Sequence, residues 1–469
     1  MAIRTFRRRI GITGLARSGK TVFLTSLINH LKYHNSKSFR IGKKGNSKIE
    51  WIKGLEDFKT DDLPAKVKNK KFNYIAYRDR LKNEKKWPEK TMDYSLYICS
   101  FNRTDWHTKD AELEFFDFPG ERMADVAMVD EPDFSAWSNK IIDTLSSYTE
   151  YEKHAGRFLE MLKMDSINPE ELIKEYKLTL ARLIKDCKPL ITPSTFLLGV
   201  EGDQPENLSA EEIANSRYCG KSSFMQFIPL SSKVANAHPD LFDACSKNYN
   251  EYRKEIVLPI FDHLKKCNSL IVLIDVTTIL AAGYGMFNDN ISILESLINV
   301  SNPGEDIKRK TASLVSSMIP KWDPGWITRI AFIATKLDKV HHDDRNNVLQ
   351  LLKQMVPKRA EQIKGLTTEY FTCSAIVSTQ KALEKEHHLA GFPISYNSDD
   401  LSSSDSKTGM VSFPVSRVPE KWPPDLEQNS YVFPDVHPIF PKLDNEAPKH
   451  IQLDKIFDFI METKHYEES

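Results

Sequence analysis

The sequence contains six cysteines but no Cys-x-x-Cys pair. Paired cysteine spacings mark zinc sites and disulfide frameworks, so their absence favours free thiols and a reducing compartment. The longest strongly apolar run, about 270–276, falls far short of the ~20 residues that a membrane-spanning helix needs. Arg7–Arg9 near the start precede no apolar stretch, so no secretory signal is predicted. We therefore expect a cytoplasmic protein without a transmembrane segment.

The chain also lacks net charge, because 65 Lys and Arg residues balance 65 Asp and Glu residues. The balance is uneven along the chain: residues 1–90 hold 24 basic and 8 acidic residues, a net of +16, which leaves −16 on residues 91–469. A strongly basic segment favours an anionic partner, such as nucleic acid or the anionic surface of the inner membrane. The alternative is a solvated face that the acidic remainder of the same chain neutralises.

The hydrophobic pattern predicts short strands that alternate with helices. A strand at 9–13 leads into a glycine-bounded turn at 14–21, and apolar residues then recur at helical spacing to about residue 33. This order of strand, turn and helix is typical of a doubly wound α/β sheet. Further strands are expected at 94–101, 112–118, 269–276, 327–334 and 369–373, and helices at 346–355 and 453–460.

Three segments interrupt this alternation. Residues 34–90 are polar, lysine-rich and irregular. Residues 121–266 are predicted to be mostly helical, with helix starts at Asn168–Glu171 and Ser209–Glu212. Residues 381–448 are rich in Pro, Ser and Asp and are expected to form a surface loop. Short strands within that loop are predicted at 393–396 and 411–415.

The segment Gly14–Thr21 matches the pattern G-x-x-x-x-G-K-[ST] between an apolar strand and an amphipathic helix. Its glycines allow backbone N–H groups to surround phosphate oxygens, and the helix N-terminus adds its positive dipole. Lys20 is expected to reach the β- and γ-phosphates, and Thr21 to ligate Mg²⁺. The motif predicts nucleotide binding without separating ATP from GTP. The expected nucleotide-binding residues are Ala16, Arg17, Ser18, Gly19, Lys20 and Thr21.

A second motif, Asp117–Gly120, ends another predicted strand. An Asp at such a strand end can hold Mg²⁺ through water, and the Gly120 N–H can contact the γ-phosphate. A threonine that closes over the γ-phosphate should lie just before the strand that starts near residue 94. Thr91 fits that position and is expected to contact the metal as well, with Thr60 as the alternative.

The segment Thr335–Asp338 directly follows a predicted strand and points to base recognition. The Asp338 carboxylate can accept hydrogen bonds from N1–H and the exocyclic amine of guanine. Adenine does not supply this pair, so the wrong base leaves a buried carboxylate unpaired. Lys336 is expected to lie along the base plane. Thr335 stands where Asn is usual, and a strand-ending turn with solvated Lys and Asp is the plain alternative.

Ser374 and Ala375 end the next strand, and their backbone N–H groups are expected to meet guanine O6. All the motifs follow predicted strands, at whose carboxyl ends α/β proteins bind ligands. The nearby segment His341–Asp344 carries metal-ligating residue types. Acidic residues at a helix start ordinarily complement the helix dipole, and the sequence favours that interpretation.

With these motifs in place, the sequence resembles the YcjX-like family of bacterial P-loop proteins over nearly its whole length. The resemblance implies a Ras-like GTPase core that uses GDP or GTP with Mg²⁺, carries a helical insertion and takes part in bacterial stress responses. Ala16 stands where many members have Ser, and because both are small the loop is still expected to close. The resemblance rests on Gly14–Thr21, Asp117–Glu121, Ala334–Val340, Ser416–Trp422 and Leu453–Lys455.

Catalytic roles are expected for Lys20, Glu121, Arg17 and Thr91. Glu121 stands where many GTPases carry a water-orienting Gln. Its carboxylate can accept a hydrogen bond from the attacking water, but it also repels the γ-phosphate, so slow intrinsic turnover is expected. The alternative is a helix-start Glu without chemistry. Arg17 can act in cis on the γ-phosphate, or it can remain a solvated loop side chain.

The sequence therefore predicts an α/β fold: a Ras-like P-loop NTPase core, with a mostly parallel sheet flanked by helices, and a large helical insertion. The expected function is Mg²⁺-dependent hydrolysis of GTP to GDP and phosphate by a switch that acts on an unknown protein partner. A P-loop ATPase or phosphotransferase is one alternative. A nucleotide-gated scaffold that binds an anionic partner through residues 1–90 is the other.

Five parts are expected along the chain. Residues 1–120 form the first part of the core, including a basic, switch-like segment at 34–93. The remaining parts are a helical insertion at 121–266, the second part of the core at 267–380, a loop-rich insertion at 381–448 and a C-terminal helix within 449–469.

Overall fold

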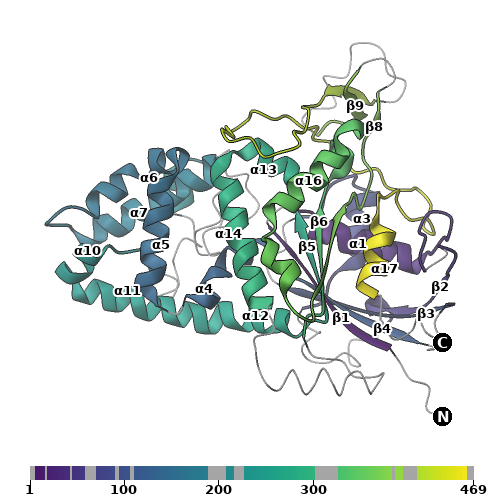
Figure 1. Cartoon of the computed structure of the whole chain (residues 1–469), viewed down its shortest axis with the longest axis horizontal. Coiled ribbons are helices and arrows are strands. Elements are labelled where there is room, and N and C mark those ends of the chain that lie inside the picture. The colour runs from purple at the N-terminus through teal and green to yellow at the C-terminus, as the bar shows by residue number, and fades with distance from the viewer. Residues whose placement is uncertain are drawn as a thin grey trace.

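A seven-stranded sheet, in the order β2-β3-β4-β1-β5-β6-β7, forms the centre of the computed structural model (Figure 1). From β4 to β7 neighbouring strands are parallel, whereas β2 and β3 run antiparallel to their neighbours. The strands are β1 Phe6–Gly14, β2 Ile49–Gly54, β3 Ser95–Arg103, β4 Ala111–Asp117, β5 Ser269–Ile274, β6 Arg329–Ala334 and β7 Thr367–Thr372. The structure describes residues 6–15, 18–42, 45–58, 70–89, 94–105, 110–131, 133–187, 208–215, 227–301, 326–382, 386–394 and 409–461.

Helices cover both faces of this sheet, which the all-buried strands β5 and β6 require. On one face, helix α17 (Leu453–Met461) places the ring of Phe457 5.9 Å from that of Phe39 and 6.2 Å from that of Phe101 on β3. The expected fold class, a mostly parallel α/β sheet flanked by helices, is confirmed. One face carries α1 Lys20–Lys32, α3 Tyr74–Lys82 and α17 Leu453–Met461, and the other carries α14 Tyr284–Ser301 and α16 Arg345–Met355 (Figure 1).

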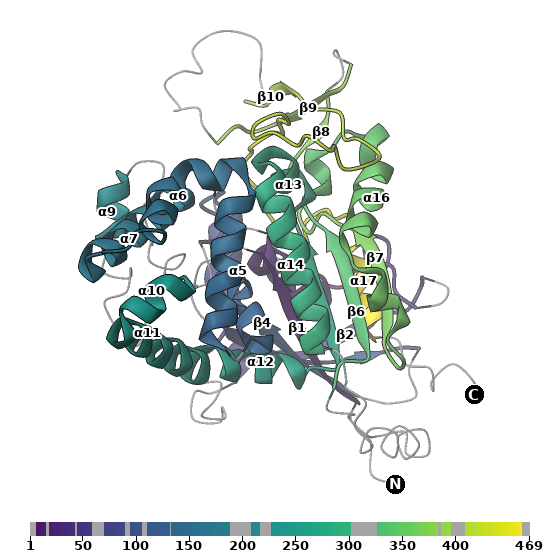
Figure 2. The ribbon, with the colours of Figure 1, turned by 60° about the vertical axis from the view of Figure 1, so that its left-hand side comes forward.

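A group of helices between β4 and β5 extends away from the sheet (Figures 1 and 2). Both predicted helix starts are confirmed: Asn168 caps α7 through the Glu170 N–H, and Ser209 forms a capping box with Glu212. The elements are η3 Gly120–Asp125, α4 Ala127–Asp130, α5 Phe134–Ser147, α6 Thr149–Met161, α7 Pro169–Asp186, α9 Ala210–Ala214, α10 Ser232–Ala237, α11 Pro239–Tyr252, the π-helical turn η6 Arg253–Val257 and α12 Leu258–Lys265.

The structure corrects the expectation that residues 34–90 are irregular, because this segment contains β2 and α3. Strand β2 is an edge strand that pairs with β3, and its charged residues obscure the alternation that would predict it. Helix α3 buries Tyr74 and Leu81 among basic residues, so its apolar face is short. The strand expected at 269–276 ends at Ile274, because Asp275 caps a new helix, α13 Val276–Ala282, through the Thr278 N–H.

The predicted loop at 381–448 contains part of a small antiparallel sheet, which lies near α13 and α16 (Figure 2). Its strands are β8 Gln380–Lys381, β9 His388–Gly391 and β10 Val411–Pro414. The strand expected at 393–396 is wrong over its described part, where Pro393 forms an isolated bridge with Val436. Among the described residues, no helix combines the length and apolarity needed to cross a bilayer.

Basic residues near the N-terminus contact acidic residues of the same chain. Arg7 and Arg9 on β1 face Glu112 and Glu114 on β4 at 3.3 and 3.4 Å. Arg78 and Lys82 on α3 both pair with Asp444. These contacts favour internal neutralisation for part of the basic segment.

We predict that His30 makes stability depend on pH. Burial, and then the neighbouring His450, lower the pKa of His30 from 6.5 to about 3. His30 therefore becomes protonated near pH 6.5 in the unfolded chain but only near pH 3 in the folded chain. The free energy of unfolding consequently decreases as the pH falls from 6.5 toward 3. Between about pH 7.5 and pH 5, this group should cost about 2 kcal/mol.

Denaturant unfolding at both pH values measures this loss. The variant His30→Leu should lose about 2 kcal/mol less than the parent between them. His388→Leu, on strand β9, serves as a control and should keep the parent's pH dependence. An unchanged pH dependence in His30→Leu would contradict the assignment.

Candidate functional site

The register of the parallel strands brings the predicted motifs to one edge of the sheet. Neighbouring strands lie about 4.8 Å apart, so loops that follow paired residues open side by side. The pairs nearest this edge are Ile12 with Asp117, Gly14 with Leu273, Ile274 with Ala334, and Ala334 with Thr372.

The segment Gly14–Thr21, the expected phosphate loop, begins where β1 passes very close to β5. Gly14 has φ of 141°, and a Cβ there would lie 2.2 Å from the Leu273 carbonyl oxygen, so only glycine fits. Gly19, with φ of 89°, is the N-cap of α1, and its carbonyl accepts a hydrogen bond from the Phe23 N–H. Ser18 between them is buried. Ala16 and Arg17 lie outside the described residues.

Lys20 and Thr21 are both buried at the start of α1. The Lys20 ammonium donates to the carbonyl oxygens of Gly14 at 3.1 Å and Leu15 at 2.8 Å, which places it against the loop. The Thr21 hydroxyl donates to Oδ2 of buried Asp117 at 3.4 Å. A hydroxyl and a carboxylate are oxygen ligands of the kind Mg²⁺ prefers, so these two residues fit the expected ion. Thr91, the third expected ligand, and its alternative Thr60 lie outside the described residues.

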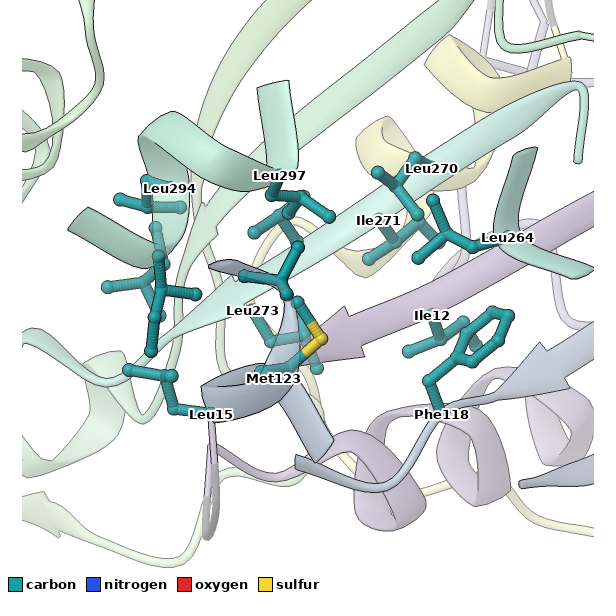
Figure 3. Packing of buried hydrophobic residues seen from close by; sticks show 14 of the residues in the cluster. Ile12, Leu15, Phe118, Met123, Leu264, Leu270, Ile271, Leu273, Leu294 and Leu297 are labelled. Atoms are coloured by element: carbon teal, nitrogen blue, oxygen red, sulfur yellow. The ribbon is translucent and has the colours of Figure 1, made fainter. Parts of the chain in front are cut away.

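The segment after Asp117 is seated on the sheet edge. Gly120 is buried and begins η3, whereas the side chain of Glu121 lies outside the described part of the chain. The Thr13 hydroxyl donates to Sδ of Met123 at 2.7 Å. Met123 therefore fastens this segment to the ends of β1 and β5, among apolar side chains that include Ile12, Leu15, Leu273 and Leu297 (Figure 3).

Asp338 lies buried in the loop that follows β6, against the loop that follows β7. Both loops are expected to recognise the base, and we call them the base-recognition loops. Its carboxylate accepts hydrogen bonds from the Ser374 hydroxyl and, at 2.9 Å, from the Ser378 N–H. Burial raises the pKa of this carboxyl, and the two hydrogen bonds oppose that rise. Each carboxylate oxygen has two acceptor sites, so two donors leave capacity for a base. The structure thus brings Asp338 and Ser374 together.

Lys336 adopts a left-handed backbone, with φ of 56°, and its ammonium lies 2.6 Å from Oδ2 of Asp275. Although burial raises the pKa of Asp275, Lys336 and the hydroxyls of Thr277 and Thr278 lower it to about 2. Asp275 is therefore charged at neutral pH and holds the Lys336 ammonium through an ion pair. Sequence reasoning missed Asp275, although it directly follows an apolar strand, which is the signal that identified Asp117.

Thr335 and Ala375 hold the base-recognition loops against the rest of the core. The Thr335 N–H donates to the Ile274 carbonyl at 2.9 Å, which ties the end of β6 to β5. The Ala375 carbonyl accepts a hydrogen bond from the Ser26 hydroxyl on α1 at 2.6 Å. Helix α1 thus connects the phosphate loop with the loop expected to meet the base.

The late segment Ser416–Trp422 packs on the helix that follows the base-recognition loop. Asn347 on α16 donates to the Val418 carbonyl at 2.8 Å, and the Trp422 indole donates to the Leu351 carbonyl at 2.9 Å. The Val418 N–H donates to Asp344 at 3.1 Å. This segment therefore holds α16 and Asp344, which follow the loop that contains Asp338, in place.

Comparison with known proteins agrees with this arrangement. The sequence model described as the YcjX-like family, DUF463, matches residues 8–464. A protein named Ras-like GTPase YcjX from Shewanella oneidensis is 24% identical over 406 residues, covering 80% of this chain and 78% of that protein. A protein of the same name from Escherichia coli is 22% identical over 480 residues, covering 97% of this chain and 95% of that protein. A match of this extent, over a chain whose strand ends carry the expected motifs, means that the protein belongs to the YcjX-like family.

Proposed function

We propose that this protein binds GTP and hydrolyses it to GDP and phosphate with Mg²⁺, acting as a nucleotide-dependent switch. The observation that carries the proposal is the Asp338 carboxylate, oriented by Ser374 and Ser378 on the sheet edge that also holds the phosphate loop. The name Ras-like GTPase, carried by two relatives, supports the same assignment. A role in a bacterial stress response is part of the proposal and rests on the family resemblance.

The proposed roles follow from charge and position. Lys20 balances charge on the β- and γ-phosphates, while Thr21 and Asp117 hold Mg²⁺. Bound Mg²⁺ would neutralise part of the phosphate charge. The Gly120 N–H is proposed to contact the γ-phosphate, and Glu121 to orient water. Arg17 in cis and Thr91 as the closing threonine complete the proposed catalytic set.

An ATP-using enzyme is the main alternative, and Asp338 disfavours it. Adenine has no N1–H to donate, so it would leave a buried carboxylate facing a base that cannot pair with it. Such a mismatch costs more than the loss of one ordinary hydrogen bond, because the carboxylate stays desolvated. The site therefore favours guanine.

The structure also suggests how a change of bound nucleotide would alter the position of the helical insertion. The Tyr252 hydroxyl donates to Asp125 at 2.8 Å. Arg253 donates to the carbonyls of Met128 at 2.7 Å and Val129 at 3.0 Å. These contacts join the segment after Gly120 to the last residue of α11 and to the π-helical turn η6, and π-turns often occur at functional sites. We propose that γ-phosphate contacts shift this segment and move η6 with it.

We predict that Asp338→Asn lowers GDP affinity by at least about 10³-fold, because an amide cannot accept both guanine donors. Xanthosine diphosphate, whose 2-oxo group can accept from the new amide, should bind the variant better than GDP does. Titration with labelled nucleotides measures both affinities, and recovery with xanthine excludes misfolding. Asp435→Asn is the control, because Asp435 is an exposed carboxylate that lies 3.3 Å from the Lys339 ammonium. Unchanged GDP affinity in Asp338→Asn would contradict guanine recognition.

A second prediction concerns Asp275→Asn. Asn still accepts the Thr278 N–H and caps α13, but it removes the charge that holds Lys336. GDP affinity should fall about tenfold, equivalent to about 1.4 kcal/mol. The melting temperature should fall as well, because the folded chain stabilises the Asp275 charge and Asn lacks that charge. Parental GDP affinity in this variant would show that the Asp275–Lys336 pair does not serve nucleotide binding.

A third prediction tests the link to the insertion. Arg253→Met removes the donors to Met128 and Val129 while keeping an unbranched side chain. The difference in hydrogen exchange between GDP-bound and GTP-analogue-bound protein should shrink in residues 239–265, with GDP affinity within about threefold of the parent. The neighbouring Lys254→Met, whose side chain is 81% exposed, is the matched control. An intact difference in Arg253→Met would rule out this route.

A further inference from the structure

Three imidazoles meet just beyond the base-recognition loop. His341 and His342 follow that loop, and His387 precedes strand β9. The ring centre of His341 lies 4.2 Å from that of His342 and 4.3 Å from that of His387. Asp343 lies beside them, with Oδ2 at 3.2 Å from Nδ1 of His341. Two segments distant in sequence thus bring metal-ligating side chains to one place.

Three ring nitrogens in this cluster, Nδ1 of His341 and both nitrogens of His387, are buried without hydrogen-bond partners among the described residues. The His341 side chain is only 6% exposed, and its Nδ1 makes no hydrogen bond within the described part of the chain. Neither ring nitrogen of His387 has a hydrogen-bond partner among the described residues. Buried polar atoms are nearly always paired, so such nitrogens indicate a ligand. His387 also has φ of 56°, an uncommon conformation that turns up at ligand sites.

We propose that His341, Asp343 and His387 bind a divalent transition-metal ion such as Zn²⁺. Each offers one ligand atom, and these atoms lie within 4.8 Å of one another. Donor atoms around tetrahedral Zn²⁺ lie about 3.3 Å apart, so small side-chain rotations close the site and leave a fourth position for water. Two imidazoles and one carboxylate suit Zn²⁺ or its neighbours rather than Mg²⁺ or Ca²⁺.

Neighbouring residues are placed to orient the proposed ligands. Nε2 of His342 lies 3.1 Å from Oδ1 of Asp343, on the carboxylate oxygen that does not face His341. Oδ2 of Asp344 lies 3.5 Å from Nε2 of His387. Carboxylates beside ligating histidines fix the ring and strengthen binding. The Arg417 guanidinium is 3.4 Å from Oδ1 of Asp344 and balances the second acidic charge.

An ion here would join the two segments that border the base-recognition loop. His341 and Asp343 lie within five residues of Asp338, and His387 leads into the small sheet β8–β10. An ion that binds only the folded chain stabilises it in proportion to the logarithm of ion concentration over Kd. The site is therefore a structural clamp, and its existence does not depend on which nucleotide the protein binds.

Calorimetric titration of the metal-free full-length protein with Zn²⁺, in the presence of GDP and Mg²⁺, tests the proposal. The parent should bind one Zn²⁺ and melt several degrees higher with it. His387→Ala should lower Zn²⁺ affinity by about 100-fold and abolish the shift in melting temperature. The control His388→Ala changes the neighbouring residue, the first of strand β9, whose Nδ1 contacts the Glu386 carbonyl, and should behave as the parent.

Parental Zn²⁺ affinity in His387→Ala overturns the proposal, as does a Co²⁺-loaded parent whose absorption spectrum shows thiolate ligands. Asp343→Asn, which alters a side chain that is 51% exposed, gives a second test if His387→Ala does not fold. It should weaken Zn²⁺ binding, and parental affinity there removes Asp343 from the site. GDP binding measured in chelator separates this proposal from guanine recognition, because each can fail while the other stands.

Discussion

The parallel register of β4, β1, β5, β6 and β7 is the constraint on which the rest of the structure depends. A shift of two residues in any pairing would move one loop by about 6.6 Å along the strands, out of reach of its neighbours. The close approach of Gly14 to Leu273 fixes one of these registers sterically. The wholly buried strands β5 and β6 need helices on both faces to cover their apolar residues.

The edge of the sheet where the parallel strands end contains several buried charged side chains. Their charges must be compensated within the protein. Asp275 and Lys336 form one such pair, and three further hydrogen bonds complete the environment of Asp275. Asp338 is held differently: it accepts hydrogen bonds from a hydroxyl and an N–H, and no ion pair neutralises it among the described residues. A carboxylate held this way keeps acceptor capacity for a ligand, whereas one that is fully ion-paired does not.

The sequence predicted the elements whose signals are local. The glycine turn before α1, the apolar strands and the helix caps at Asn168 and Ser209 each depend on a few adjacent residues, and each is confirmed as an element of the fold. The role of that turn as a phosphate loop stays a prediction. It failed where partners are distant: β2 is a strand because it pairs with β3, and His387 meets His341 only through the fold. The proposed catalytic roles of Arg17, Glu121 and Thr91 stay predictions.

The segment that follows Asp117 is held from two sides, and this decides how it can move. Met123 anchors it to the sheet through Thr13, while Tyr252 and Arg253 anchor it to the insertion. A displacement of Gly120 toward a phosphate must therefore strain one anchor or carry η6 with it. Apolar packing around Met123 is dense (Figure 3), whereas the contacts of Arg253 are hydrogen bonds that a tilt of the helix can preserve. Under the proposed switch, we therefore expect the insertion to be the side that moves.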